Sequence, residues 1–209
     1  MKTRTDIINT LFEKYIFYSY LEIGVRRPSE NFDKIKATIK HSVDPYPNEK
    51  YTYNVTSDDF FMNHVNQKYD VIFIDGMHTD EQAYKDVQNS IKYLNENGFI
   101  VIHDCNPANE WLTRTYDDYL KELGGWNGTV YKAFLKLKYE LQNWSCFVVD
   151  ENYGCGILTQ RNLIKNEIIL WDGTWDDFDK KRIELLQLIS YEIFLSLLTS
   201  NNMKDIILK

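Results

Sequence analysis

The chain has 209 residues, of which 44% are hydrophobic, which is enough for one folded domain with its own core. Its net charge of -7 argues against a general nucleic-acid-binding protein, because a phosphate backbone requires a basic surface. The sequence has no run of about 18 apolar residues and no signal-sequence pattern at its N-terminus. We therefore expect a cytoplasmic protein. Its cysteines, Cys105, Cys146 and Cys155, are odd in number and lack metal-ligand spacing, which is typical of reduced thiols in the cytosol.

The first part of the chain predicts a helix followed by three strands. Apolar residues at helical spacing indicate the opening helix: Ile7, Ile8, Leu11, Phe12 and Tyr15. The expected strands span residues 18–25, 41–43 and 51–55. Between the first two, Pro28 and Ser29 predict the start of a helix with Phe32, Ile35 and Ile39 along one face.

The clearest pattern lies in the middle of the chain. Residues 70–75 form a short apolar run bounded by turn residues, typical of a strand buried on both faces. Thr79 and Gln82 predict a capping box for the next helix, which Asn97-Gly98 would end. Residues 99–102 read as the following strand. This order is a βαβ unit, so the two strands should be parallel.

The remaining elements are two helices, a hairpin and a last helix. Helices are expected at 111–123 and 130–141, and strands at 145–149 and 154–159. The connection between these strands is too short for a parallel crossover, so they should form an antiparallel hairpin. Thr174 or Asp176 could cap a last helix, and the apolar residues around its circumference favour a homodimer: Ile183, Leu186, Ile189, Ile193 and Leu197.

These elements predict a single three-layer α/β domain over residues 1–209, with a core of about 18–160 and a helical extension at 161–209. In an open parallel sheet, ligands bind outside the carboxyl ends of the strands. Gly24 ends the first strand and would let a ligand approach the backbone, or it serves an ordinary turn. Asp44 ends the next strand and could accept hydrogen bonds from a ribose, or cap a turn before Pro45.

Several motifs then resemble a known family. They are Tyr20-Leu21-Glu22-Ile23-Gly24-Val25, Ser42-Val43-Asp44-Pro45, Ile74-Asp75-Gly76-Met77-His78, Ile102-His103-Asp104-Cys105-Asn106-Pro107 and Trp126-Asn127-Gly128-Thr129. In this order they resemble small bacterial class I methyltransferases of the methyltransferase domain 24 type, over about residues 18 to 160. The resemblance implies a Rossmann-like, mostly parallel seven-stranded sheet with an antiparallel last strand.

The resemblance also implies a cofactor, S-adenosylmethionine, and places residues around it. Glu22 and Gly24 would face its methionine part, Asp44 its ribose, and Ser57 or Asp58 its adenine. Val25 and Asp75 are also expected among the cofactor-binding residues. The usual three-glycine first loop is reduced here to Gly24 followed by Arg26 and Arg27, which predicts an altered or weakened cofactor site. Such enzymes often act in glycan or antibiotic biosynthesis, so a small hydroxylated acceptor such as a sugar is the implied substrate.

Methyl transfer to a hydroxyl requires an aligned acceptor and a base for its proton. Asp75 and His78 follow one predicted strand, and His103 and Asp104 end its neighbour, so these groups could converge. We interpret His78 as the general base because an unperturbed imidazole titrates near pH 6.5. It could instead bond the backbone at a helix N-terminus, and His103 could point into the flank of the sheet.

A metal and two rival functions stay open at this point. Asp75 and Asp104 could hold Mg²⁺, with His78 or Asn106 completing the ligand set, by analogy with methyltransferases that bind a metal at similar positions. Cys105 is interpreted as a buried structural thiol, and the tryptophans and Tyr131 as core residues or as a stacking surface for a sugar. The rival functions are a nicotinamide-dependent oxidoreductase, which would need the missing G-x-G-x-x-G loop, and a non-catalytic protein that retains the fold.

Overall fold

The computed structural model describes residues 2–46 and 49–207, with side chains described as far as Thr199. Over these residues, seven strands form one sheet in the order β2-β1-β3-β4-β6-β5-β7. The strands are β1 (Ser19–Ile23), β2 (Ile39–Val43), β3 (Tyr69–Ile74), β4 (Leu94–Ile102), β5 (Ser145–Val149), β6 (Cys155–Thr159) and β7 (Leu188–Ile189). β6 runs antiparallel to β4 and β5, whereas the other neighbouring pairs are parallel. The predicted fold class and the predicted hairpin are confirmed. The two-residue β7 comes after the antiparallel strand β6 in the chain and pairs with β5 at the edge of the sheet.

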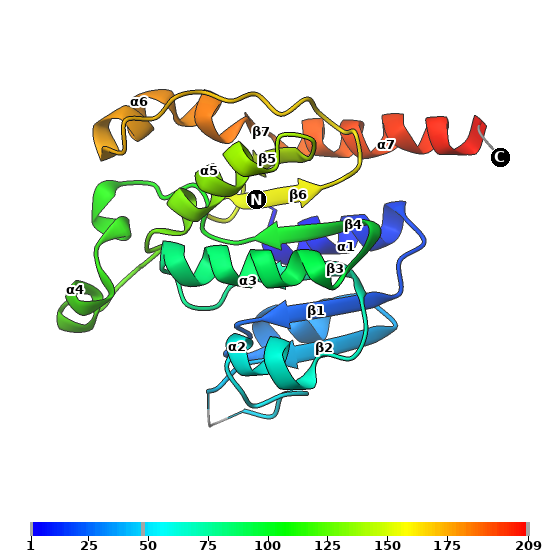
Figure 1. Ribbon diagram of the computed structural model, residues 1–209, viewed down its shortest axis with the longest axis horizontal. Coiled ribbons are helices and arrows are strands. Elements are labelled where there is room, and N and C mark those ends of the chain that lie inside the picture. Colours follow the sequence, from blue (N-terminus) through cyan, green and yellow to red (C-terminus); the bar gives the residue numbers. More distant parts are fainter. Residues whose placement is uncertain (1, 47–48, 208–209) are drawn as a thin grey trace.

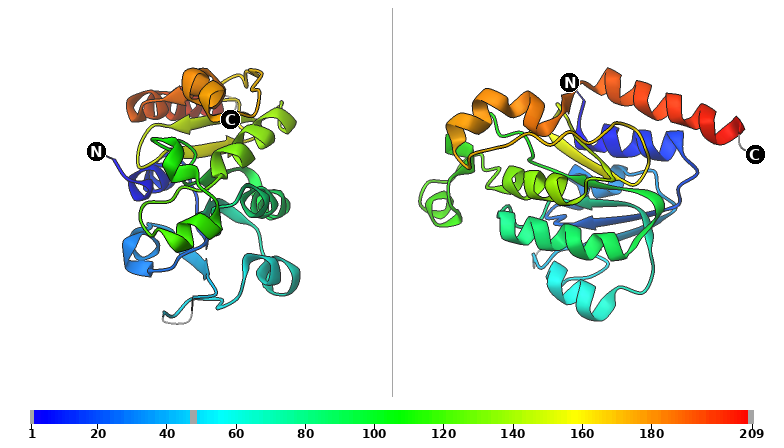
Figure 2. Two further views of the ribbon diagram at one scale, coloured as in Figure 1. Left: turned by 90° about the vertical axis from the view of Figure 1, so that its left-hand side faces the viewer. Right: turned by 45° about the horizontal axis from the view of Figure 1, so that its top comes forward.

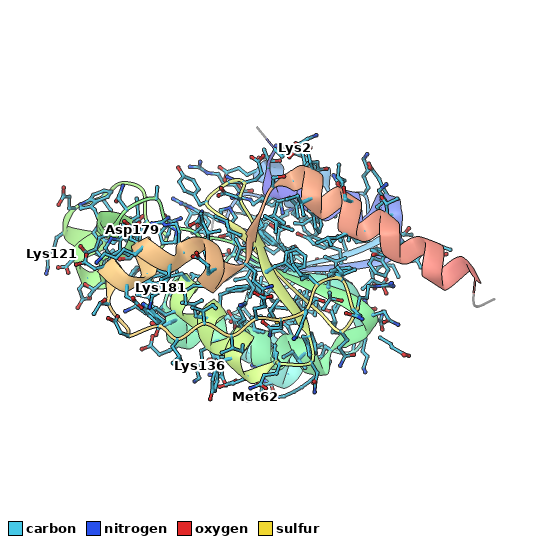
Figure 3. All side chains as sticks on the ribbon, turned by 90° about the horizontal axis from the view of Figure 1, so that it is seen from above. Lys2, Met62, Lys121, Lys136, Asp179 and Lys181 are labelled. Atoms are coloured by element: carbon cyan, nitrogen blue, oxygen red, sulfur yellow. The ribbon has the colours of Figure 1, made fainter. Side chains whose placement is uncertain are left out.

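Helices cover both faces of this sheet. They are α1 (Arg4–Lys14), α2 (Ser57–Asp59), α3 (Asp80–Lys92), α4 (Tyr116–Lys121), α5 (Val130–Glu140), α6 (Trp175–Leu186) and α7 (Tyr191–Ile207), with short turns η1 (Pro28–Glu30), η2 (Phe32–Lys34), η3 (Phe60–His64) and η4 (Glu110–Thr113). α1 and α3 lie on opposite sides of the sheet (Figure 2). In the view from above, Lys2, next to α1, and Lys136 of α5 lie on opposite sides of the molecule (Figure 3). Within the described part of the chain, no helix is long and apolar enough to cross a membrane.

Alternating strand residues build two cores, one on each face. Tyr20 and Phe73 belong to the cluster that includes residues of α1 and α7, whereas Leu21 and Ile72 belong to the cluster under α3 and α5. All four side chains are fully buried. This alternation follows from the two-residue period of a strand, and burial on both faces explains the continuous apolar runs in the sequence.

Two predictions near the start of the sheet are wrong. No α-helix forms after Pro28: the segment makes the turns η1 and η2, separated by Asn31, whose side-chain amide donates to Glu22 Oε2 at 2.9 Å. Nor do residues 51–55 form a strand; only Tyr53 makes a single bridge to Val43. Next to this bridge the hydroxyl groups of Ser42 and Thr52 take hydrogen bonds from the backbone of the facing segment, in place of ladder bonds.

Three predicted boundaries also differ from the structure. α3 ends at Lys92 and β4 already begins at Leu94, because Leu94 pairs with Tyr69 across a bulge; Asn97-Gly98 therefore lie inside a strand. The predicted helix at 111–123 is divided into η4 and α4, with Thr115 capping α4. The last predicted helix is divided into α6 and α7 at Gln187, which has a left-handed φ of 44°.

Candidate active site

The strand register aligns one row of residues at the carboxyl edge of the sheet. Ile23 pairs with Val43 on one side and Ile74 on the other, and Ile74 pairs with Ile102. The next residues along these four strands are therefore neighbours: Asp44, Gly24, Asp75 and His103. Backbone hydrogen bonds continue one step beyond the strands, from Asp75 N to Ile23 O at 2.8 Å and from His103 N to Ile74 O at 3.0 Å. The arrowheads of β1, β2 and β4 point to the side where α4 lies (Figure 1).

A cavity of about 940 Å³ opens at this edge. Nine residues predicted for the cofactor, the chemistry or the metal line it: Gly24, Val25, Asp44, Ser57, Asp58, Asp75, His78, His103 and Asp104. The structure thus brings together residues from four strand ends and from the segment before α3. A volume of this size is in the range of small-molecule sites.

Gly24 is required here by the closeness of two backbones. Its φ is +83°, and a Cβ atom built on it would lie 2.2 Å from the carbonyl oxygen of Asp75. Any other residue would collide with the neighbouring strand and occupy a left-handed conformation that glycine adopts readily. Of the three glycines usual in the loop after the first strand, this chain keeps only Gly24, and Gly24 is the position at which the neighbouring backbone leaves no room for a side chain.

Glu22 lies behind the cavity wall and not among the lining residues. It shares a strand face with Tyr20, beneath α1, and its carboxylate accepts hydrogen bonds from Tyr20 Oη at 2.6 Å and Asn31 Nδ2 at 2.9 Å. Only 2% of the residue is exposed. Burial raises the pKa of Glu22 to about 8 in spite of these hydrogen bonds. Contact between this carboxylate and a cofactor in the cavity therefore finds no support in the geometry.

Carboxylates and hydroxyls form the end of the cavity near β2. Asp44 accepts backbone hydrogen bonds from Arg26 N and Tyr46 N, both at 2.7 Å, so the turn cap foreseen as an alternative is present. A carboxylate has about four acceptor positions, so Asp44 keeps capacity for a ligand. Gln82 Nε2 donates to Ser57 Oγ at 3.2 Å and to Asp58 Oδ1 at 3.3 Å, linking α3 to this end.

Two imidazoles and two carboxylates meet at the other end of the cavity. His78 Nε2 lies 3.4 Å from Asp75 Oδ1, and His78 Nδ1 lies 3.2 Å from Asp104 Oδ2. His103 Nδ1 is 3.3 Å from a carboxylate oxygen of each aspartate. The convergence expected from neighbouring strand ends is therefore present.

This mutual contact shifts the protonation of the cluster. Burial alone would raise the pKa of Asp75, but the two histidines hold it well below its ordinary value. Burial would lower the pKa of His103, yet the charges of Asp75 and Asp104 raise it to about 10. Burial likewise opposes protonation of His78, but its hydrogen bond to Asp75 and the charge of Asp104 raise its pKa above the ordinary value. His103 is thus an imidazolium at neutral pH, located between two carboxylates.

The segment Trp126–Thr129 holds His78 and Asp104 in place. His78 Nδ1 lies 3.0 Å from the carbonyl oxygen of Trp126, and the two rings stack with centroids 5.2 Å apart. Asn127 Nδ2 donates to Asp104 Oδ1, and Thr129 N donates to His78 O at 2.9 Å. Since a carbonyl oxygen only accepts, His78 Nδ1 carries a proton. Sequence reasoning assigned no role to Asn127, although it lies in a motif that carried the family resemblance.

Most of the aromatic residues weighed as a stacking surface are already occupied. Trp126 lies between His78 and Tyr119, whose ring is 4.8 Å away at an interplanar angle of 10°. Arg114 covers the ring of Trp111 at 3.6 Å. Tyr131, Trp171 and Trp175 contact one another or the core cluster under α5. Cys105 is fully buried, with Sγ 3.4 Å from Ile102 O, in line with a structural thiol.

The cluster does not fit Mg²⁺ well. Ligand atoms of Asp75, His78 and Asp104 lie within 4.8 Å of one another, so a cation could reach all three. However, one of the three ligands is a nitrogen, whereas Mg²⁺ prefers six oxygens. The positions beside both carboxylates are also taken by the buried imidazolium of His103. A divalent ion would have to displace this side chain.

Comparison with known proteins agrees with this geometry. Residues 25–105 match the family model of a methyltransferase domain, the methyltransferase domain 24 type. A Staphylococcus aureus protein assigned as a caffeoyl-CoA O-methyltransferase has a similar structure, with a TM-score of 0.55 and 16% identity over 77% of this chain and 85% of that chain.

The Podospora anserina methyltransferase PaMTH1, solved with bound S-adenosylhomocysteine (SAH), is similar with a TM-score of 0.53 and 14% identity, over 78% of this chain and 80% of that chain. No relative matches among the curated proteins. At these identities the structural neighbours establish the fold alone. Residues 25–105, which include the ends of β2, β3 and β4, are therefore similar to a methyltransferase domain, and the fold of the chain is that of these structural neighbours.

Proposed function

We propose that the cavity binds S-adenosylmethionine and that the enzyme transfers its methyl group to a hydroxyl of a small acceptor. The observation that carries the proposal is the row Asp44, Gly24, Asp75 and His103, which lines one cavity together with His78. Asp44 would receive the ribose hydroxyls, and Ser57 or Asp58 the adenine. Val25 and Gly24 would lie along the methionine part.

His78 is the proposed base. Its Nδ1 proton is directed to the carbonyl of Trp126, which leaves Nε2 as the atom that accepts a proton from the acceptor. Asp75 Oδ1, 3.4 Å from Nε2, stabilises the imidazolium that results. The cofactor supplies a methyl group that is already activated for displacement. His103 Nδ1, 3.3 Å from a carboxylate oxygen of Asp75 and of Asp104, would orient both carboxylates beside the reacting groups.

The acceptor is proposed to be a small hydroxylated molecule such as a sugar or a precursor of a glycan or antibiotic. Leu112, Tyr116 and Tyr119 line the cavity beyond His78 and offer it a wall with both apolar surface and hydroxyl groups. A panel of catechols, sugars and hydroxylated natural-product precursors, assayed for methyl transfer, tests this choice. Turnover with catechols only would contradict the sugar as acceptor.

Calorimetric titration tests the cofactor site. We expect binding of SAH and none of NAD, and we expect Asp44→Ala to weaken SAH binding by about tenfold or more, since hydrogen bonds to a charged group contribute about 1.5–3 kcal/mol. Asp33→Ala, which removes a carboxylate outside the cavity, is the matched control and should leave the affinity unchanged. Binding of NAD in place of SAH would favour the oxidoreductase, and equal SAH affinities of the two variants would contradict the role of Asp44.

A chelator added to the same purified protein tests whether turnover requires a metal ion. We expect turnover to be unaffected by a chelator, because His103 already neutralises the carboxylates that Mg²⁺ would need. Loss of activity with the chelator, restored by Mg²⁺, would instead show that Asp75, His78 and Asp104 bind a metal.

A further inference from the structure

Arg4 is a cavity residue that lies far outside the matched segment 25–105. It is the first residue of α1, and its side chain is 22% exposed and lines the cavity. Hydrogen bonds fix this end of α1 at the rim: Arg4 N donates to Asn152 Oδ1 at 3.2 Å, and Thr5 Oγ1 donates to Asn31 Oδ1 at 2.7 Å. The backbone that carries the Arg4 side chain is therefore anchored to Asn152, in the turn between β5 and β6, and its neighbour Thr5 to Asn31, between η1 and η2.

The guanidinium itself is only loosely paired. Its nearest carboxylate oxygens belong to Asp75 at 3.6 Å and Glu30 at 4.0 Å. Charge-assisted hydrogen bonds of arginine are normally about 2.7–2.9 Å long, and the group has five N–H donors in a planar fork. Arg4 thus has donors to spare for a ligand that enters the cavity.

The charges of the lining single out this residue. Five carboxylates line the cavity: Glu30, Asp44, Asp58, Asp75 and Asp104. Among the residues that the structure describes, the cationic Lys and Arg side chains of the lining are Arg4 and Arg26. Arg26 belongs to the Asp44 end, where its backbone N–H donates to Asp44 Oδ2. Arg4 belongs to the Asp75 end. The imidazolium of His103 also lies at this end, but its Nδ1 already faces Asp75 and Asp104. A negatively charged group that enters this acidic cavity needs a cation beside it, and Arg4 is placed to provide it.

We propose that Arg4 binds the carboxylate of the amino-acid part of the cofactor. This inference rests on the proposed function, because it takes the ribose to lie at Asp44. In the row of strand ends, Gly24 and then Asp75 follow Asp44, so the amino-acid part extends toward Arg4. A planar guanidinium fits a carboxylate in a two-pronged arrangement that a lysine could not reproduce.

The alternative role for Arg4 is a structural counter-charge for Asp75, and the choice of ligand separates the two. S-adenosylmethionine and its decarboxylated form differ only in the carboxylate. Calorimetry on the purified full chain gives the dissociation constant of each. We expect the wild type to bind the carboxylated ligand about 10- to 100-fold more tightly. In Arg4→Gln this preference should fall below about threefold, whereas the matched variant Arg26→Gln should retain it. Arg4→Lys should keep part of it.

Three results would overturn the inference. The first is a wild type that binds both ligands equally, a result that needs no variant and therefore holds even if Arg4→Gln does not fold. The second is a folded Arg4→Gln variant that keeps the preference or weakens both ligands alike, as a structural counter-charge would. The third is a wild type that binds neither ligand. This result would contradict the proposed function as well. It is distinguished from the first two because no heat of binding is observed.

Discussion

In the segment between β3 and α3, His78 contacts two carboxylates and one backbone carbonyl. Asp75 and Asp104 raise its pKa although burial opposes protonation. A base with a raised pKa is available only at a pH above that value, so the acidic neighbours shift the active pH range upward. They also favour the imidazolium once the proton has been taken. The same contacts therefore orient the ring and determine the pH at which it works.

We accordingly expect kcat/KM to rise with pH along a limb whose pKa exceeds 6.5. Asp104→Asn removes one charge that raises this pKa and should move the limb to lower pH. His78→Ala should lower kcat by about 10²- to 10⁴-fold and abolish the limb. Measured pH–rate profiles check this. His64→Ala, which alters an exposed histidine paired with Asp59, is the control and should keep the wild-type profile. An unchanged limb in His78→Ala would show that the base is another group.

Glu22 makes stability depend on pH. Its pKa in the folded protein is about 8, raised chiefly by burial above the 4.5 of the free side chain. Between these values the unfolded chain binds fewer protons than the folded one, so the contribution of this group to stability is lost as the pH rises. Glu22→Gln cannot titrate. Relative to wild type, this variant should therefore lose less stability between pH 5 and pH 8.

Urea unfolding at the two pH values measures this difference. We expect it to be at least about 1 kcal/mol, because one pKa unit corresponds to about 1.4 kcal/mol. Glu96→Gln, at an exposed position in β4, is the control and should show the wild-type pH dependence. Parallel curves for Glu22→Gln and wild type would show that Glu22 is ionised in the fold at neutral pH.

At the scale of elements, the site depends on a loop that packs beneath a helix start. Two hydrogen bonds join the loop before α5 to the start of α3. Thr129 N donates to His78 O, and Asp80 N donates to Thr129 Oγ1 at 2.8 Å. Gly128 allows this approach. Its φ is +60°, and an added Cβ atom would lie 1.8 Å from His78 O. The position of the proposed base is therefore determined by two elements that meet at one glycine.

Gly128→Ala should destabilise the protein by clearly more than the cost of a left-handed alanine alone, about 1 kcal/mol, and should also lower turnover. Gly173→Ala separates the cost of a left-handed alanine from the cost of the collision with His78. Gly173 has a φ of +92° but no atom within 4 Å of an added Cβ. Chemical unfolding and steady-state rates of both variants provide the test. Equal destabilisation by the two substitutions would mean that contact with His78 contributes nothing.

At the scale of the whole molecule, the C-terminal segment takes part in both cores. Phe178, Leu185 and Leu186 belong to the cluster under α3 and α5, and Phe194 and Leu198 to the cluster under α1. Phe178 and Phe194 are fully buried. That residues 1–209 form a single domain stays a prediction, and this packing supports it. The homodimer stays a prediction, supported by the exposure of Ile183 and Ile193, at 64% and 50%.

Phe178→Ala should lower the free energy of unfolding by about 3–5 kcal/mol, the usual cost of removing a buried phenylalanine. Ile183→Ala, on the exposed side of the same helix, should cost less than about 0.5 kcal/mol. Urea unfolding followed by circular dichroism should show one transition for wild type and for both variants. Two separate transitions, with only the second shifted by Phe178→Ala, would show that the extension is a domain of its own.

Much of the fold follows from local sequence. Buried strands such as β3 are apolar runs ended by polar residues, and the connection at 150–154 is too short for anything but a hairpin. The helix expected after Pro28 did not form because the polar side chain of Asn31 reaches Glu22 in β1, a contact that no periodicity records. The predicted strand at 51–55 is reduced to the single bridge of Tyr53 to Val43, and beside this bridge the hydroxyls of Ser42 and Thr52 accept the hydrogen bonds that a ladder would make.

By itself the sequence determined which residues end the strands, and therefore that Asp44, Gly24, Asp75 and His103 share one edge. Only the tertiary structure decided how that edge is completed. Arg4 reaches Asp75, and Asn127 reaches Asp104, from segments distant in the chain. Glu22 points beneath α1 and away from the cavity. Local sequence specifies strands and their ends through hydrophobic period and turn residues, whereas long-range contacts depend on how helices pack on the finished sheet.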